Sequence, residues 1–186
     1  MTLTPMMQQY MEIKEQHKDA ILFFRLGDFY EMFFDDALVA SKAMEVTLTG
    51  KNCGLPERAP MCGVPYHAAD GYIAKLIEKG FKVAVCEQTE DPAEAKGLVR
   101  REVVRVVTPG TVTSQTMLRA NENNYLAAIY TDREGAGLVY CDVSTGEISA
   151  AQRTGPTSGA WLKDELARID AREVLYNREE IPEDDV

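Results

Sequence analysis

AILFFRLGDFYEMF, residues 20–33, decides how the first part of the chain folds, because two largely apolar runs flank a Gly–Asp pair. A Gly–Asp pair in this position is typical of a two-residue hairpin turn. The alternative is a helix that begins at Asp28, with Glu31 completing a capping box. In the hairpin Phe29 and Glu31 share one face of a strand, above a packed Tyr30 and Met32, whereas in a helix they point about 160° apart. The turn favours the hairpin.

Further helices and strands alternate on both sides of this hairpin. Thr4–Pro5 is a typical helix start, and apolar residues at helical spacing extend that helix to about Lys18. We expect further helices from Asp35 or Asp36 to Met44 and over 68–80, strands at 81–88 and 101–107, and a loop with at most one short strand over 56–65. This alternation predicts a mixed α/β sheet with flanking helices.

The pattern changes after TPGTVT, residues 108–113. Three strand candidates joined by short turns predict a meander, which a capped amphipathic helix and one more strand follow. The strands are expected at 124–132, 137–146, 147–152 and 173–177, and the helix at 157–170. We therefore expect a first domain over 1–107, a linker over 108–118 and a second, incomplete α/β domain over 119–186.

The acidic charge of the chain limits the classes of partner. The 186 residues carry a formal net charge of −10, and the first 107 carry 13 Lys and Arg against 16 Asp and Glu. A nucleic-acid binder that depends on phosphate contacts alone would normally carry a basic excess. Any DNA contact must be local or helped by other parts. The sequence has one basic cluster, which could position phosphates or form a solvated strand face: Lys96, Arg100, Arg101 and Arg105. Strand alternation predicts that Arg101 and Arg105 share one face.

Several other functions find little support in the sequence. The four cysteines form no C-x-x-C pair and the two histidines are not at metal-ligand spacing to them, so reduced, partly buried thiols are expected. Apolar runs are too short to span a membrane, and no signal peptide begins the chain, which predicts a cytoplasmic protein. No phosphate-binding G-x-x-x-x-G-K-[ST] motif occurs, since TGKNCG lacks the spacing. We expect no catalytic residue, metal or cofactor in this chain.

The pairing of Phe29 with Glu31 admits two interpretations. Aromatic side chains in strands usually pack in a core or at a sheet edge. In proteins that deform DNA, by contrast, an apolar wedge enters the minor groove between base steps and kinks the duplex. Phosphates would repel a carboxylate beside such a wedge unless it bonds to a base edge. The pair therefore suits a base that has left its normal pairing.

Five motifs in order resemble the N-terminal part of the MutS family of DNA mismatch-repair proteins. They are TPMMQQY, FFRLGDFYEMFFDDA, APMCGVPYHA, VAVCEQTEDP and VVRVVTPGT. The resemblance is strong over residues 4 to about 118 and weaker beyond. It implies that Phe29 stacks on a mispaired or unpaired base from the minor groove of a kinked duplex and that Glu31 hydrogen-bonds this base. It also places the loop with Tyr66 and His67 near the DNA backbone; alternatively, Tyr66 packs and His67 caps the next helix.

For the second domain, the resemblance implies part of a connector domain with a ribonuclease-H-like fold. Two other functions remain open for it. Asp142 and Glu147 could hold two Mg²⁺ ions in a nuclease, although Asp142 precedes Ser-Thr-Gly, an ordinary turn sequence. The acidic domain could instead be a protein-interaction module. The resemblance further implies a homodimeric full-length protein that uses ATP and Mg²⁺ and works with other repair proteins.

Overall fold

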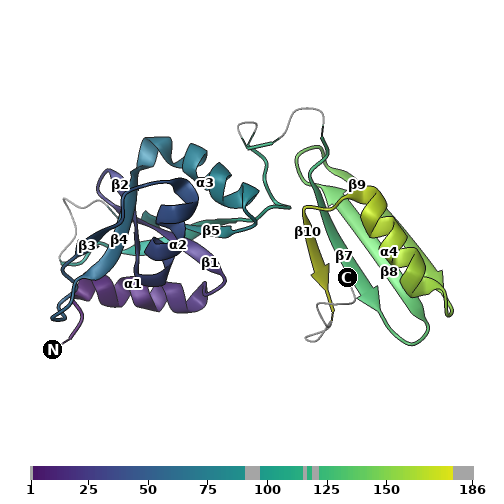
Figure 1. Ribbon diagram of the computed structural model, residues 1–186, viewed down its shortest axis with the longest axis horizontal. Coiled ribbons are helices and arrows are strands. Elements are labelled where there is room, and N and C mark those ends of the chain that lie inside the picture. The colour runs from purple at the N-terminus through teal and green to yellow at the C-terminus, as the bar shows by residue number, and fades with distance from the viewer. Residues whose placement is uncertain (1, 91–96, 115–116, 119–121, 178–186) are drawn as a thin grey trace. The chain divides into compact units, whose positions relative to one another are not determined.

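The computed structural model describes residues 2–90, 97–114, 117–118 and 122–177, and its chain divides into two compact units (Figure 1). The first unit is Met1–Thr108 and the second is Pro109–Val186. The division falls at the start of the expected linker. In the described residues, the first unit combines several helices with one sheet and the second combines one helix with one sheet, which confirms the mixed α/β fold that the sequence predicts.

A six-stranded sheet forms the centre of the first unit, with the strand order β3-β4-β2-β1-β5-β6. Strands β1 and β5 are parallel, and the other neighbours are antiparallel. The helices of the unit are α1 (Pro5–Gln16), α2 (Phe34–Met44) and α3 (Ala69–Glu78), with a 3-10 turn η1 (Tyr66–Ala68) before α3. The strands are β1 (Ala20–Leu26), β2 (Phe29–Phe33), β3 (Thr49–Lys51), β4 (Ala59–Pro65), β5 (Lys82–Gln88) and β6 (Arg101–Val107).

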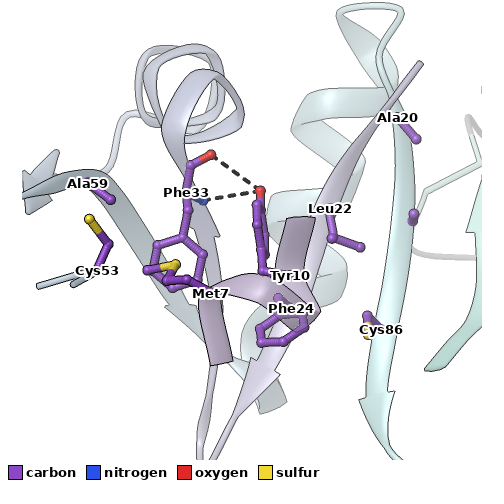
Figure 2. Packing of buried hydrophobic residues seen from close by; sticks show 10 residues of the cluster. Met7, Tyr10, Ala20, Leu22, Phe24, Phe33, Cys53, Ala59 and Cys86 are labelled. Carbon is purple, nitrogen blue, oxygen red and sulfur yellow. Dashed lines mark hydrogen bonds between the residues drawn. The ribbon is translucent and has the colours of Figure 1, made fainter. Parts of the chain in front are cut away.

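Helix α1 covers one face of this sheet. It begins as the sequence predicts, because the Thr4 hydroxyl accepts a hydrogen bond from the backbone N–H of Met7 and proline follows at the first helical position. Figure 2 shows its buried Met7 and Tyr10 among Phe24 and Phe33 of the sheet. The Tyr10 ring meets the Phe33 ring edge-on at 5.0 Å between centroids. This cluster fixes α1 over the β1–β2 hairpin.

The hairpin forms where the Gly–Asp pair predicts it. Gly27 has φ +57°, which a glycine adopts without strain, and Leu26 is paired with Phe29 across the two-residue turn. Residues 29–33 are a strand, so the alternative helix that begins at Asp28 is wrong. The face that a side chain of β2 occupies is therefore set by strand alternation.

Residues 59–65 are more regular than the expected loop with at most one short strand. They form the seven-residue strand β4 between β3 and β2. Pro60 and Pro65 favour a loop in the sequence, but both lie where the ladder with β2 ends: Pro65 is in its last pair, with Phe29, and Pro60, which is paired with Gly50 of β3, lies beyond the pair of Phe33 with Met61. Proline is tolerated at such ladder ends because no backbone N–H is needed there.

The second unit is built on a four-stranded sheet with the order β10-β7-β8-β9. Its elements are β7 (Tyr125–Thr131), β8 (Gly135–Asp142), β9 (Glu147–Thr154), α4 (Ser158–Ile169) and β10 (Glu173–Tyr176). The predicted meander β7-β8-β9 is confirmed, and β10 adds in parallel beside β7. Leu162 and Ile169 of α4 pack on Ala127 and Leu138 of the sheet. In the part of the chain that the structure describes, no helix is both long and apolar enough to cross a membrane.

Candidate functional site

Phe29 and Glu31 lie side by side on one face of β2. Tyr30 and Met32 point to the opposite face and are buried, whereas the Phe29 side chain remains 47% exposed. Phe33, two residues beyond Glu31 on the same face, is fully buried under α1. The face is therefore covered at one end of the strand and open at the hairpin end, where an aromatic ring stands next to a carboxylate.

A lysine holds the carboxylate of Glu31. The ammonium nitrogen of Lys51, on β3, lies 2.5 Å from Glu31 Oε2 and 5.6 Å from the centroid of the Phe33 ring. Strand β4 separates the two, but its residue opposite Glu31 is Gly63. A Cβ at Gly63 would lie 3.3 Å from the Tyr30 carbonyl oxygen and in ordinary contact, 3.5 Å, with Glu31 Cγ, so the glycine leaves the space beside the Glu31 side chain open. The sequence analysis did not identify Lys51, because its approach depends on the strand order β3-β4-β2.

The loop with Tyr66 and His67 is attached to the same end of the hairpin. The backbone N–H of Tyr66 donates to the Asp28 carbonyl over 2.9 Å, and the preceding Pro65 is paired with Phe29. The Tyr66 side chain is 44% exposed, so it is not buried in the core, although one face of its ring is covered by Arg25. Helix α3 begins after Ala68, which makes no side-chain cap bond, so His67 is not its N-cap.

Arg25 holds this loop in place. Its guanidinium carbon lies 3.7 Å from the centroid of the Tyr66 ring, and its Nη1 lies 3.4 Å from the Glu87 carboxylate. The Tyr30 hydroxyl also donates to Glu87. Burial, with the neighbouring Glu87, raises the pKa of Tyr30 to about 12, so this hydroxyl stays protonated as a donor. Arg25, which the sequence analysis did not single out, thus connects the Tyr66 loop to β5.

The basic cluster does not form one surface. Lys96 lies outside the described residues, and Arg100 is exposed and paired with Glu102. Arg105 is also exposed and lies 3.1 Å from Asp70 of α3. Arg101, by contrast, is only 7% exposed.

The guanidinium of Arg101 is used inside the first unit. Its Nε donates to the Arg25 carbonyl, and its Nη1 donates to Gln9 Oε1 and to the Val99 carbonyl, at 2.7 to 2.9 Å. The group also lies over the Phe24 ring at 5.0 Å. Burial lowers the pKa of Arg101 from its ordinary value, and the three acceptors satisfy donors of the buried guanidinium. Its position indicates a structural role.

The prediction that Arg101 and Arg105 share a face is wrong because β6 contains a bulge. Val85 is paired with Arg105, but the next residue of β5, Cys86, is paired with Val103. Val104 is therefore an extra residue, and one extra residue reverses the face of everything beyond it. Arg101 consequently points to the α1 face and Arg105 to the α3 face.

In the second unit, the Asp142 carboxylate closes a turn. It accepts hydrogen bonds from the Ser144 hydroxyl at 2.6 Å, the Ser144 N–H at 2.9 Å and the Asn124 N–H at 3.0 Å. These bonds, that of the Ser144 side chain first, lower the pKa of Asp142 although burial opposes the change. Glu147 is paired with Asp142 across the β8–β9 hairpin. Within residues 2–90, 97–114, 117–118 and 122–177, no three His, Cys, Asp or Glu side chains are grouped to hold a metal. The geometry favours the turn interpretation of Asp142 over the nuclease hypothesis.

Comparison with known proteins gives matches over both units. Residues 4–116 match the family model described as MutS domain I, and residues 124–185 match MutS domain II. Proteins named DNA mismatch repair protein MutS are 61% identical in Acetivibrio thermocellus and 60% in Ruminiclostridium cellulolyticum, each over 178 residues, or 96% of this chain and 20% of the relative. The relative from Clostridioides difficile is 58% identical over 175 residues, or 94% of this chain and 18% of the relative. The chain thus spans about a fifth of the length of these relatives.

Proposed function

The chain belongs to the MutS family of DNA mismatch-repair proteins, and from this premise we propose that its first unit is a mismatch-recognition domain. Phe29 enters the minor groove and stacks on a mispaired or unpaired base, Glu31 accepts a hydrogen bond from that base, and the duplex is kinked. The observation that carries the proposal is the exposed Phe29 ring beside the Glu31 carboxylate, on a strand whose other residues are mostly buried.

Discrimination in this mechanism comes from the mechanics of DNA. Separating two stacked base pairs costs a few kcal/mol in a regular duplex and less at a mispair, whose bases stack and pair poorly. Smooth bending of a duplex site costs about 1–6 kcal/mol, and a flexible step lowers this cost. A wedge such as Phe29 therefore favours sites that are already easy to unstack and bend, whatever the sequence around them.

Contacts with the DNA backbone are proposed for the neighbouring residues. Tyr66 and His67 are candidates because their loop is attached to the hairpin end next to Phe29. Arg100 and Arg105 are candidates because their guanidinium groups are exposed and pair at the surface with Glu102 and Asp70, respectively. Arg101 is not, because all three of its donated hydrogen bonds lie inside the unit.

The remaining functions of the family are proposals for its full-length members. The second unit is proposed to be part of a connector domain, whose acidic surface would meet other mismatch-repair proteins. ATP and Mg²⁺ use and homodimerisation are assigned to parts of the relatives that have no match in this chain. A cytoplasmic location fits these roles.

The proposal is tested by comparing two DNA duplexes. We would use a full-length MutS protein in which this chain replaces the matching segment, called the full-length carrier below. Fluorescence anisotropy at fixed low salt gives its dissociation constants for a G·T heteroduplex and for the paired homoduplex. Stacking on an aromatic ring is worth about 1–3 kcal/mol per base, so Phe29→Ala should weaken heteroduplex binding about 5- to 150-fold and homoduplex binding much less.

Tyr130→Ala is the matched control, because Tyr130 is an exposed aromatic residue on a strand of the second unit. It should leave both dissociation constants unchanged. Equal losses on the two duplexes with Phe29→Ala, or none on either, would overturn the proposed role of Phe29 as the wedge.

A further inference from the structure

We propose that Lys51 is a positioning residue for Glu31: it holds one carboxylate oxygen in an ion pair and thereby presents the other to the mispaired base. This inference rests on the proposed function of Phe29 and Glu31. It assigns part of the mismatch discrimination to a side chain from β3, a strand that does not adjoin β2.

The ion pair is specific in its geometry. Lys51 Nζ lies 2.5 Å from Oε2 of Glu31. Among the described residues, Lys51 is the hydrogen-bonding partner of the Glu31 side chain, and none donates to its Oε1. A carboxylate offers about four lone-pair directions on two oxygens, so Oε1 keeps its full capacity to accept a bond from a base edge.

Packing restricts both partners. The side chains of Glu31 and Lys51 are only 16% and 33% exposed. The Lys51 ammonium also lies 5.6 Å from the Phe33 ring centroid, within the range of a cation–π contact, and Phe33 itself is fully buried. A partly buried pair is screened less by salt than an exposed one. The orientation of the carboxylate is therefore set before DNA arrives.

The sheet explains how a lysine two strands away reaches Glu31. Lys51 is paired with Ala59 of β4, and Glu31 with Gly63 of the same strand. Side chains at alternate positions of β4 share a face, so Lys51, Ala59, Gly63 and Glu31 all belong to the α1 face. Met61 lies between Ala59 and Gly63 on that face, with its sulfur 3.7 Å from Thr49 Oγ1 of β3. Lys51 Nζ reaches Glu31 beside the Phe33 ring, which is in the same row as Met61.

Lys51 also compensates the charge of Glu31 near DNA. An isolated carboxylate close to two rows of phosphates is repelled by them, whereas a carboxylate paired with an ammonium presents little net charge. Without Lys51, the Glu31 carboxylate should no longer be held in one orientation, and its negative charge should repel the phosphates without compensation. The orientation matters only for a base that can bond to Glu31, so the heteroduplex should lose more affinity than the homoduplex.

A double-mutant cycle in the full-length carrier tests this role. Coupled neighbours give interaction effects of about 2- to 150-fold, and we expect Lys51→Met to reduce the heteroduplex preference about 5- to 20-fold. In the Glu31→Gln background the same substitution should change the preference less than about twofold, because the group that Lys51 positions is gone. Lys51→Arg, which can still pair with Glu31, should restore most of the preference.

Three outcomes would overturn the inference. If Lys51→Met weakens both duplexes equally and lowers the salt dependence of binding by about one unit, Lys51 contacts a phosphate directly. If it reduces the preference equally in the wild-type and Glu31→Gln backgrounds, it does not act through Glu31. If Lys51→Arg fails to restore the preference in a folded protein, the ion pair is not what matters.

Phe29→Ala, measured in the same series, separates this inference from the proposed function. Loss of heteroduplex preference with Phe29→Ala but none with Lys51→Met would reject the role of Lys51 alone. No loss with Phe29→Ala would reject the proposed function itself. Urea unfolding of each variant shows whether the protein remains folded.

Discussion

Replacing Arg101 by methionine should destabilise the first unit without changing how the protein depends on salt to bind DNA. Methionine keeps a long apolar side chain over the Phe24 ring but removes the guanidinium. The substitution removes three donated hydrogen bonds, to the Arg25 and Val99 carbonyls and to Gln9 Oε1; the Val99 carbonyl keeps a bond from Gln9 Nε2 at 3.2 Å. The matched control is Arg105→Met on the same strand, where the guanidinium is exposed.

The magnitude follows from the hydrogen bonds that are lost. Bonds to a charged group contribute about 1.5–3 kcal/mol each, so three of them set a loss of at least about 4.5 kcal/mol. Removing the buried charge relieves a desolvation cost of several kcal/mol, which offsets part of this loss. We expect a net decrease of about 2–4 kcal/mol in the free energy of unfolding. At Arg105, the exposed ion pair with Asp70 is worth at most about 1 kcal/mol.

Urea unfolding followed by circular dichroism measures the difference. Arg101→Met should lower the unfolding midpoint with an unchanged slope, and Arg105→Met should leave it nearly in place. Anisotropy titrations of the full-length carrier at several salt concentrations provide the second readout. Arg105→Met should flatten the salt dependence by about one unit, whereas Arg101→Met should not. Equal stability losses, or a flatter salt dependence with Arg101→Met, would refute the assignment of Arg101 to structure.

Three further predictions concern stability. Phe33→Ala should lower the free energy of unfolding by about 3–5 kcal/mol because Phe33 is fully buried, whereas Phe29→Ala should lower it by clearly less. Calorimetry of both variants measures the two losses. Similar losses would contradict the exposed position of Phe29. Burial raises the pKa of the Cys62 and Cys86 thiols to about 11 and about 12, above the ordinary value of 9.0, so the folded state holds their protons longer than the unfolded chain. The two thiols therefore contribute fully to the free energy of unfolding below about pH 9, and this contribution is lost as the pH rises toward 11–12, by up to about 1.4 kcal/mol per pH unit for each thiol. Urea unfolding midpoints should fall from pH 8 to 11, and they should fall less steeply in Cys86→Ala. Because the pKa of Asp142 is lowered in the folded state, its carboxylate stabilises the second unit above the ordinary carboxyl pKa, and this stabilisation is lost as the pH falls through the lower folded value. Asp142→Asn should therefore make the unfolding free energy less dependent on acid pH. An unchanged acid profile would argue against the turn role.

The hairpin and its exposed face were predictable from sequence because their causes are local. A glycine that adopts positive φ, followed by aspartate between apolar runs, determines the turn. Strand alternation then places Phe29 and Glu31 together. The meander of the second unit was predictable for the same reason, since short turns join neighbouring strands.

The features that sequence reasoning missed depend on pairing between distant segments. The bulge at Val104 is visible only in the ladder with β5, and it places Arg101 inside the unit. The role of Lys51 depends on the order β3-β4-β2, in which Gly63 lies opposite Glu31. Strand β4 was hidden by prolines that lie where its ladder with β2 ends. No local pattern contains this information.

The proposed wedge is tested most directly by asking whether the side chain at position 29 touches the mispaired base. Phe29 is replaced by the photoreactive analogue p-benzoylphenylalanine in the full-length carrier, and the protein is irradiated on a G·T heteroduplex and on its homoduplex. The same analogue at Tyr130 is the control. If Phe29 is the wedge, cross-links should be concentrated at the mispaired nucleotides of the heteroduplex, with few on the homoduplex. Cross-links spread evenly along both duplexes, or none above the Tyr130 control, would contradict it.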